Sequence, residues 1–126
     1  MRDDIDNMDL ELRNLTDVEI DPFLTHINDY GIIKMTGSIP YPVDRDWVIE
    51  RFKSKNNLEI QGGTADRAIY WRGEFAGNAG YFTNEDQNIE VGYWIAKSFW
   101  GRGLATRVTH MLVDLARSHG HTGILY

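Results

Sequence analysis

The pattern of hydrophobic and polar residues is most regular in the second half of the chain. Residues 89–95 alternate strictly between the two kinds, which predicts a strand with one apolar face. Residues 68–71 and 75–82 are two further apolar runs, and the turn Arg72-Gly73-Glu74 between them is typical of a β-hairpin. These segments predict three antiparallel strands that follow one another along the chain.

Apolar residues recur at helical spacing between residues 101 and 119, which predicts a long amphipathic helix. Its apolar face would consist of Leu104, Val108, Met111, Leu112 and Leu115. Gly120 is the expected C-terminal cap, and residues 122–126 then begin a last strand. Because a helix connects this strand to residues 89–95, we expect the two strands to be parallel.

The first half of the chain opens with a short strand and a helix. Residues 10–12 alternate between apolar and polar, as in a strand. Thr16 and Glu19 have the spacing of a capping box, but a helix that begins there would place Pro22 in its second turn. We therefore prefer Asp21 as the cap of the first helix, with Pro22 as its first residue. The alternative is that the preceding turn, from Thr16, is helical as well.

A second helix is expected after the irregular segment 37–42, which contains two prolines. Asp44 is its expected N-cap, and its buried face would consist of Trp47, Val48 and Phe52. Residues 53–66 are mostly polar and include a Gly-Gly pair, so we expect a surface loop there. The order is then strand, two helices, three strands, helix and strand, which predicts an α+β fold with a mixed, mainly antiparallel sheet.

Composition narrows the classes of protein that fit. The 126 residues, 42% of them hydrophobic, describe one domain, residues 1–126, and the absence of cysteine excludes disulfides and thiolate chemistry. No apolar stretch is long enough for a signal peptide or a membrane span, so we expect a cytoplasmic protein without a membrane partner. The formal net charge of −6 argues against a nucleic-acid partner and is compatible with cationic substrates such as amines.

The junction between the strand at residues 89–95 and the last helix is the candidate binding site. Gly101 and Gly103 form a glycine-rich loop ahead of a helix N-terminus, where free N–H groups and the helix dipole attract anions. Lys97 and Arg102 make the segment basic. The spacing matches neither a Walker loop nor a dinucleotide fingerprint, so an ordinary tight turn remains the alternative to an anion site.

A resemblance to a known family decides between these alternatives. Residues 100–106, Trp-Gly-Arg-Gly-Leu-Ala-Thr, resemble the acetyl-CoA loop of the GNAT N-acetyltransferases, whose pattern is Gln/Arg-x-x-Gly-x-Gly/Ala. Gly103 and Ala105 occupy its last two fixed positions. Trp100 departs from the pattern in a way that is similar to the branch that acetylates the N-termini of ribosomal proteins. Further matches to that branch are residues 39–42, 73–78 and 90–95.

The resemblance implies a GNAT-like fold with helices on both faces of the sheet, acetyl-CoA as the acetyl donor, and no metal. Backbone groups of Tyr93, Trp94 and Ile95 would hydrogen-bond the pantetheine arm as if it were an added strand. Backbone N–H groups would bind the pyrophosphate, and these belong to Gly101, Arg102, Gly103, Leu104, Ala105 and Thr106.

The implied chemistry is direct attack of a neutral amine on a thioester, and it requires a group that takes the amine proton. A nearby carboxylate, acting directly or through water, suits this role. Glu90 is the candidate, because it faces the same way as Gly92 and Trp94 on its strand. Its alternative role is that of a solvated surface charge. Tyr41 is the candidate for binding the acceptor, since the loop between the first two helices lines the acceptor side in this family.

The expected function is therefore acetyl transfer from acetyl-CoA to a primary amine, either a protein N-terminal α-amine or a small amine. The alternative is a coenzyme A-binding module without turnover, or an inactive fragment of an acetyltransferase. Members of the resembled family continue past the last strand through another helix and two strands. We accordingly expect the 126-residue chain to be truncated and to associate with itself through an unpaired sheet edge.

Overall fold

A computed structural model describes residues 9–36, 39–60 and 62–125 of the chain. Gly37 and Ser38 of the segment expected to be irregular, and Tyr126 of the last strand, lie outside these residues. The elements, in chain order, are β1 (Leu10–Asn14), η1 (Asp17–Glu19), α2 (Ile20–Ile27), α3 (Tyr30–Thr36), α4 (Arg45–Ile60), β2 (Thr64–Trp71), β3 (Glu74–Thr83), β4 (Ile89–Ile95), η2 (Lys97–Phe99), α5 (Leu104–Ser118) and β5 (Ile124–Leu125).

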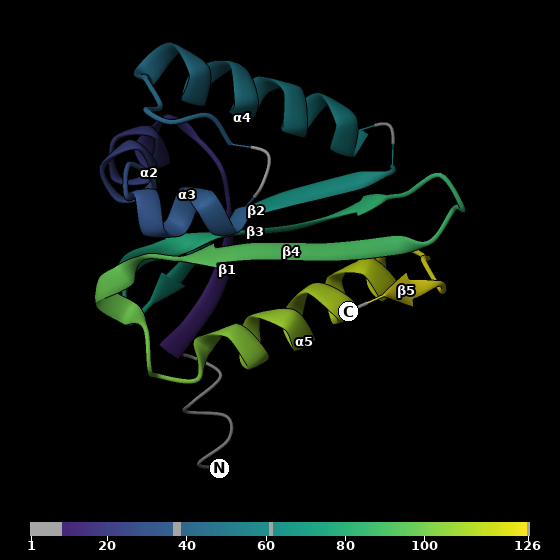
Figure 1. Ribbon diagram of the computed structural model, residues 1–126. Coiled ribbons are helices and arrows are strands. Elements are labelled where there is room, and N and C mark those ends of the chain that lie inside the picture. Colours follow the sequence, from purple (N-terminus) through teal and green to yellow (C-terminus); the bar gives the residue numbers. More distant parts are fainter. Residues whose placement is uncertain (1–8, 37–38, 61, 126) are drawn as a thin grey trace.

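The five strands form one sheet in the order β1-β2-β3-β4-β5. Neighbouring strands from β1 to β4 are antiparallel, whereas β5 runs parallel to β4, as the helical connection between them predicts. In Figure 1, α2, α3 and α4 lie over one face of the sheet and α5 lies over the other. The predicted α+β fold with a mixed, mainly antiparallel sheet and helices on both faces is confirmed.

The core is densest where α2 and α4 meet the sheet. Phe23 of α2 is completely buried, and its ring lies 5.2 Å from both the Phe52 ring of α4 and the Trp94 ring of β4, edge to face in each case. Such aromatic pairs add directional contacts to the burial of apolar area. Trp94 is thereby fixed from the helical side of the sheet.

The expected start of the first helix is wrong, and the capping box occurs instead. Thr16 caps the 3-10 turn η1, its hydroxyl accepts from the Val18 N–H, and the Glu19 carboxylate accepts from the Thr16 N–H. The chain then continues into α2, in which Pro22 is the third residue. Proline is tolerated there because the first four N–H groups of a helix have no partner within it.

Two further expectations for the helical half are wrong. An additional helix, α3, begins after Asp29, whose side chain accepts from the Gly31 N–H and whose carbonyl accepts from Ile32 and Ile33. Most of residues 53–66 is not a loop, since α4 continues to Ile60 and β2 begins at Thr64. Gly62 and Gly63 form a turn between them, and Gln61 lies outside the described residues.

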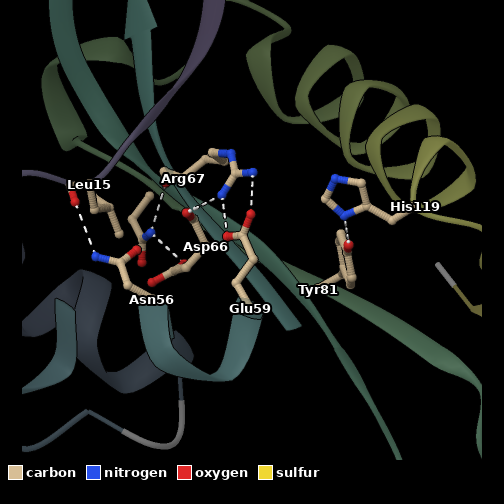
Figure 2. Close-up of polar contacts among 8 residues, drawn as sticks. Leu15, Asn56, Glu59, Asp66, Arg67, Tyr81 and His119 are labelled. Carbon is tan, nitrogen blue, oxygen red and sulfur yellow. Dashed lines mark hydrogen bonds and ion pairs between the residues drawn. The ribbon is translucent and has the colours of Figure 1, made fainter. Parts of the chain in front are cut away.

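The polar residues of this stretch have partners that a sequence does not reveal. Asn56 donates to the Leu15 carbonyl, and Glu59 at the end of α4 pairs with Arg67 of β2 through two hydrogen bonds of 2.6 and 2.8 Å (Figure 2). The expected cap and face of α4 are otherwise largely confirmed. Asp44 accepts from the Trp47 N–H, Val48 and Phe52 are buried, and only Trp47 stays partly exposed.

Glu19 is a buried carboxylate whose partners come from the N-terminal turn and from the sheet. It accepts from Thr16 and from the Tyr70 hydroxyl of β2, 2.7 Å away. Burial alone would raise the pKa of Glu19, but these hydrogen bonds outweigh it and lower the pKa. Burial and the hydrogen bond to Glu19 raise the pKa of Tyr70 to about 12.

We expect Glu19→Gln to lower the free energy of unfolding at pH 7 by about 1–3 kcal/mol, because a buried hydrogen-bonded charge is lost. Since the folded-state pKa is lowered, the stabilisation exists above the pKa of the unfolded chain and disappears as the pH falls through the folded value. Urea unfolding of both proteins at several pH values measures this difference. Glu50→Gln, at an exposed carboxylate of α4, is the matched control and should change little.

Candidate functional site

The loop between β4 and α5 has a backbone that requires glycine at two positions. Gly101 and Gly103 have φ angles of +79° and +70°, in the left-handed region that L side chains rarely adopt. Gly103 is the N-cap of α5 and offers no side chain to the first turn, so α5 begins at Leu104 rather than at Gly101 as expected. The first N–H groups of a 15-residue helix are therefore left for an external acceptor.

A cavity lies between this loop and β4, and we refer to it as the loop cavity. It is lined by Met35 of α3, by Tyr93, Trp94 and Ile95 at the end of β4, and by Phe99, Trp100, Gly101, Arg102, Gly103, Leu104 and Ala105. Eight of the nine predicted binding residues of the loop and the end of β4 thus line this cavity, and the ninth, Thr106, follows one residue later in α5.

The outer edge of β4 is only partly used by the sheet. Trp94 pairs with Asn78 of β3, and the Ala96 N–H donates to the Ala76 carbonyl, while the Ile89 N–H donates to Gly123 beside β5. The alternation of an antiparallel ladder then directs the backbone groups of Tyr93 and Ile95 away from β3. Within the described chain, β5 pairs with β4 only at Ile89 and Glu90.

The Trp100 side chain hydrogen-bonds to one backbone group on this edge of β4. Its indole N–H donates to the Ile95 carbonyl over 2.7 Å, which attaches the glycine loop to the end of β4. Lys97 nearby pairs with Asp29 at 3.9 Å and lies over the Trp100 ring. The loop is therefore fixed to both β4 and the segment between α2 and α3.

A second cavity, the sheet cavity, lies on the face of the sheet that α3 and α4 cover. Its lining includes Arg51 and Lys55 of α4, Asp66 of β2, and Asn78 and Gly80 of β3 together with Gly92 of β4. Met35, Tyr93 and Trp94 line both cavities. The two cavities consequently lie against each other, with the end of β4 between them.

Among the described residues that line the two cavities, Asp66 is the only acidic one, and it is 4% exposed. One carboxylate oxygen accepts from the Asn78 amide at 2.8 Å, and the other lies 3.9 Å from a guanidinium nitrogen of Arg51. Burial raises the pKa of Asp66, although Arg51 and the Asn78 hydrogen bond act in the opposite direction. Figure 2 shows Asp66 on β2, one residue before the Arg67 that pairs with Glu59.

The other two predicted residues lie elsewhere. Glu90 is near the start of β4, accepts from the Asn84 side-chain amide at 3.1 Å, and is absent from the described lining of either cavity. Tyr41 is exposed in the segment after α3 and packs edge to face on Tyr30. The structure therefore does not bring Glu90 and Tyr41 together with the loop.

Sequence reasoning missed the polar cluster of the sheet cavity, Arg51, Asp66 and Asn78. The only available signal was an aspartate two residues before the apolar run at residues 68–71, and it was overlooked because residue 66 was assigned to a loop.

Two absences concern the described residues alone. No three histidine or acidic side chains among them are grouped so that they could hold a metal ion. In the same part of the chain, no helix has the length and apolar character needed to cross a membrane.

Comparisons with known proteins agree with this architecture. The family model described as acetyltransferase (GNAT) domain matches residues 9–125. No curated protein matches the chain.

Solved structures of acetyltransferases have a similar fold. RimL, a ribosomal-protein α-N-acetyltransferase, is 18% identical with a TM-score of 0.73, over 88% of this chain and 62% of that one. The microcin C7 self-immunity acetyltransferase MccE, solved with acetyl-CoA and AMP, is 15% identical with a TM-score of 0.70, over 84% and 61%. A Salmonella typhimurium acetyltransferase that modifies an N-terminal serine of a ribosomal protein is 18% identical with a TM-score of 0.67, over 86% and 64%. The chain thus spans less than two thirds of these proteins, and the likeness shows the fold.

The close approach of β3 and β4 beside the loop cavity gives a stability prediction. A Cβ atom at Gly77 would lie 2.1 Å from the Trp94 carbonyl oxygen, whereas one at Gly92 would meet nothing within 4 Å. Gly77→Ala should therefore lower the free energy of unfolding by about 2–3 kcal/mol, as overpacking does. Gly92→Ala is the matched control in the same sheet and should stay within about 0.5 kcal/mol. Equal unfolding curves for the two variants would contradict the observed approach.

Proposed function

This chain belongs to the acetyltransferase (GNAT) domain family, and on that basis we propose that it transfers the acetyl group of acetyl-CoA to a primary amine. The observation that supports the proposal most directly is the loop cavity, in which an open helix N-terminus, a glycine-rich loop and an unpaired strand edge meet. Coenzyme A offers a pyrophosphate for the glycine-rich loop and the helix N-terminus, and an amide-containing arm for the strand edge.

We expect the pyrophosphate to lie at the start of α5. The N–H groups from Gly101 to Thr106 belong to the loop and the first turn of α5, where the two glycines present no side chain to an incoming phosphate. Arg102 lies over the Trp71 ring with its guanidinium carbon 4.9 Å from the ring centre. A cation held beside the helix N-terminus adds to the attraction for an anion.

We expect the pantetheine arm to lie along the outer edge of β4. Tyr93 and Ile95 direct backbone groups to that edge, while Trp94 pairs with β3 and contributes its ring. The Ile95 carbonyl already accepts from Trp100, so the Tyr93 groups and the Ile95 N–H are the natural partners. The thioester at the end of the arm would then reach the place where the two cavities meet.

The acceptor would enter from the sheet cavity, on the other side of Trp94. The proposed acceptors are a protein N-terminal α-amine or a small amine. RimL and the Salmonella acetyltransferase act on ribosomal proteins, which supports the first class. Tyr41 remains a predicted acceptor contact, from its exposed position after α3.

The proposed function is tested by two measurements on the chain. Calorimetry reports whether CoA binds, and release of the CoA thiol from acetyl-CoA reports transfer when peptides with a free N-terminus, diamines or aminoglycosides are added. Binding with amine-dependent thiol release would support the enzyme. Binding without release from any amine would identify a coenzyme A-binding module, and absence of binding would overturn both.

Gly103→Val should weaken CoA binding about tenfold or more, because a branched side chain would stand where the pyrophosphate approaches. The matched control is Gly120→Val at the opposite end of α5. Both glycines have positive φ angles, +70° and +89°, and neither Cβ would meet an atom within 4 Å, so the backbone strain is comparable. Calorimetry should show the loss of affinity for Gly103→Val alone. Equal CoA affinities in the two folded variants would contradict the proposed position of the pyrophosphate at this loop.

Glu90 remains the predicted proton acceptor. If it takes the amine proton, Glu90→Gln should slow transfer by about 10²–10⁴-fold while CoA binding is kept. The loss should be greatest at low pH, where fewer amines are already neutral. If Glu90→Gln transfers acetyl groups as fast as the parent between about pH 6 and pH 9, Glu90 is a surface charge and not the proton acceptor.

A further inference from the structure

Three buried polar atoms of the described chain have no hydrogen-bond partner, and all three belong to residues that line the sheet cavity. They are Asp66 Oδ2, Arg51 Nε and Trp94 Nε1. Buried polar groups are nearly always paired, so each such atom requires an explanation. One acceptor and two donors, each nearly without solvent contact, thus belong to lining residues of a single cavity, and a polar ligand there is what would satisfy them.

The sheet leaves a path without side chains between Asp66 and the end of β4. Asp66 pairs with Gly80 of β3, and Gly80 pairs with Gly92 of β4, so the three residues share one face of the sheet. A Cβ at Gly80 would lie 2.9 Å from the Asp66 carboxylate, and the space above Gly92 is open. Two strand spacings make this row roughly 10 Å long.

We propose that Asp66 binds the acceptor amine in the sheet cavity and takes its proton, while Arg51 and Trp94 donate to an oxygen atom beside that amine. The inference rests on the proposed function and names the acceptor site of the same reaction. In the step, the Asp66 carboxylate takes one proton from the ammonium group, and the neutral nitrogen attacks the thioester carbonyl carbon. A C–N bond forms, the C–S bond breaks, and the second amine proton ends on the departing CoA sulfur.

The electrostatic surroundings of Asp66 suit this exchange. The groups that face it are Arg51 and Lys55 of α4, its neighbour Arg67 on β2, and the Asn78 amide of β3. The three cations act to lower the pKa of Asp66, but burial outweighs them and raises it. A raised pKa brings a carboxylate closer to the amine in proton affinity, which favours general-base catalysis. Glu90 lies outside the described cavity lining, where its carboxylate accepts from the Asn84 amide, so Asp66 is here the alternative to Glu90 as proton acceptor.

The two donors restrict the acceptor class. In a peptide N-terminus, the carbon that bears the α-amine also bears a carbonyl group, whose oxygen can accept from Arg51 Nε and Trp94 Nε1. A diamine such as putrescine has no acceptor atom and would leave both donors unpaired in a buried site. Sites of this kind reject analogues that lack the matching polar atom.

The first test compares Asp66→Asn with Asp86→Asn, the same chemical change at an exposed residue of the β3–β4 turn. The probe is trialanine amide, and thiol release gives kcat/KM across pH. In the parent, kcat/KM should fall at low pH as Asp66 is protonated and at high pH as the ammonium is lost, near pH 8. Asp66→Asn should lose about 10²-fold at neutral pH and approach the parent above the amine pKa, with a curve that only rises. Asp86→Asn should keep the parent profile.

A structural role of Asp66 would lower the rate without changing the shape of the pH profile, and that result would overturn the proposal. Calorimetry of trialanine amide with the CoA-saturated protein gives a readout independent of turnover. Asp66→Asn should weaken this binding at least about tenfold. Failure of the parent to bind CoA would overturn the proposed function, whereas normal CoA binding with unchanged amine affinity in Asp66→Asn would overturn only the role of Asp66.

A second variant leaves Asp66 untouched in case Asp66→Asn does not fold. Gly92→Val places a side chain in the open part of the path, where the structure predicts no clash. It should raise the KM for trialanine amide about tenfold or more and keep the affinity for CoA. The parent should also prefer trialanine amide to putrescine. An unchanged KM in Gly92→Val, or equal use of the two amines, would contradict the proposed site.

Discussion

The site depends on how β4 is hydrogen-bonded. Along its length, from Ile89 to Ile95, β4 pairs with β3 on one side. On the other side, β5 pairs with it only at Ile89 and Glu90 within the described chain. A strand that is held on one edge and open on the other is rigid and yet able to bind an extended ligand. The glycine loop, the start of α5 and both cavities are all arranged around this open end.

The position of Trp94 is fixed both at its backbone, by the neighbouring strand β3, and at its ring, by the core. Gly77 lets β3 approach the Trp94 backbone at a distance that no side chain would permit. Phe23 and Phe75 pack against the indole ring from the core. Trp94 therefore cannot move without disturbing the sheet or the core, which makes it a firm wall between the two cavities.

The strands and the final helix could be predicted from the sequence because their apolar residues follow one period over many positions, as at residues 89–95 and in α5. The loop residues were predicted for a different reason, because the glycines and the resemblance to the acetyl-CoA loop both lie in one short stretch of sequence. Prediction failed where long-range partners decide the structure. α4 extends through polar residues that bond Leu15 and Arg67, and Asp66 meets Arg51 only in the folded chain. The start of the first helix failed for a local reason, because Pro22 is the third residue of α2, where the N–H groups have no partner within the helix.

The two buried carboxylates Glu19 and Asp66 differ in their hydrogen bonding and in the direction of their pKa shifts. Glu19 accepts from the backbone and hydroxyl of Thr16 and from Tyr70, and its pKa is lowered, so it remains charged and links the N-terminal turn to the sheet. Asp66 accepts one hydrogen bond from Asn78, has a second oxygen that accepts none, and has a raised pKa. A fully satisfied network rigidifies a fold, whereas a half-satisfied one is a liability unless a ligand completes it. The contrast between the two residues separates a structural charge from one poised to exchange a proton.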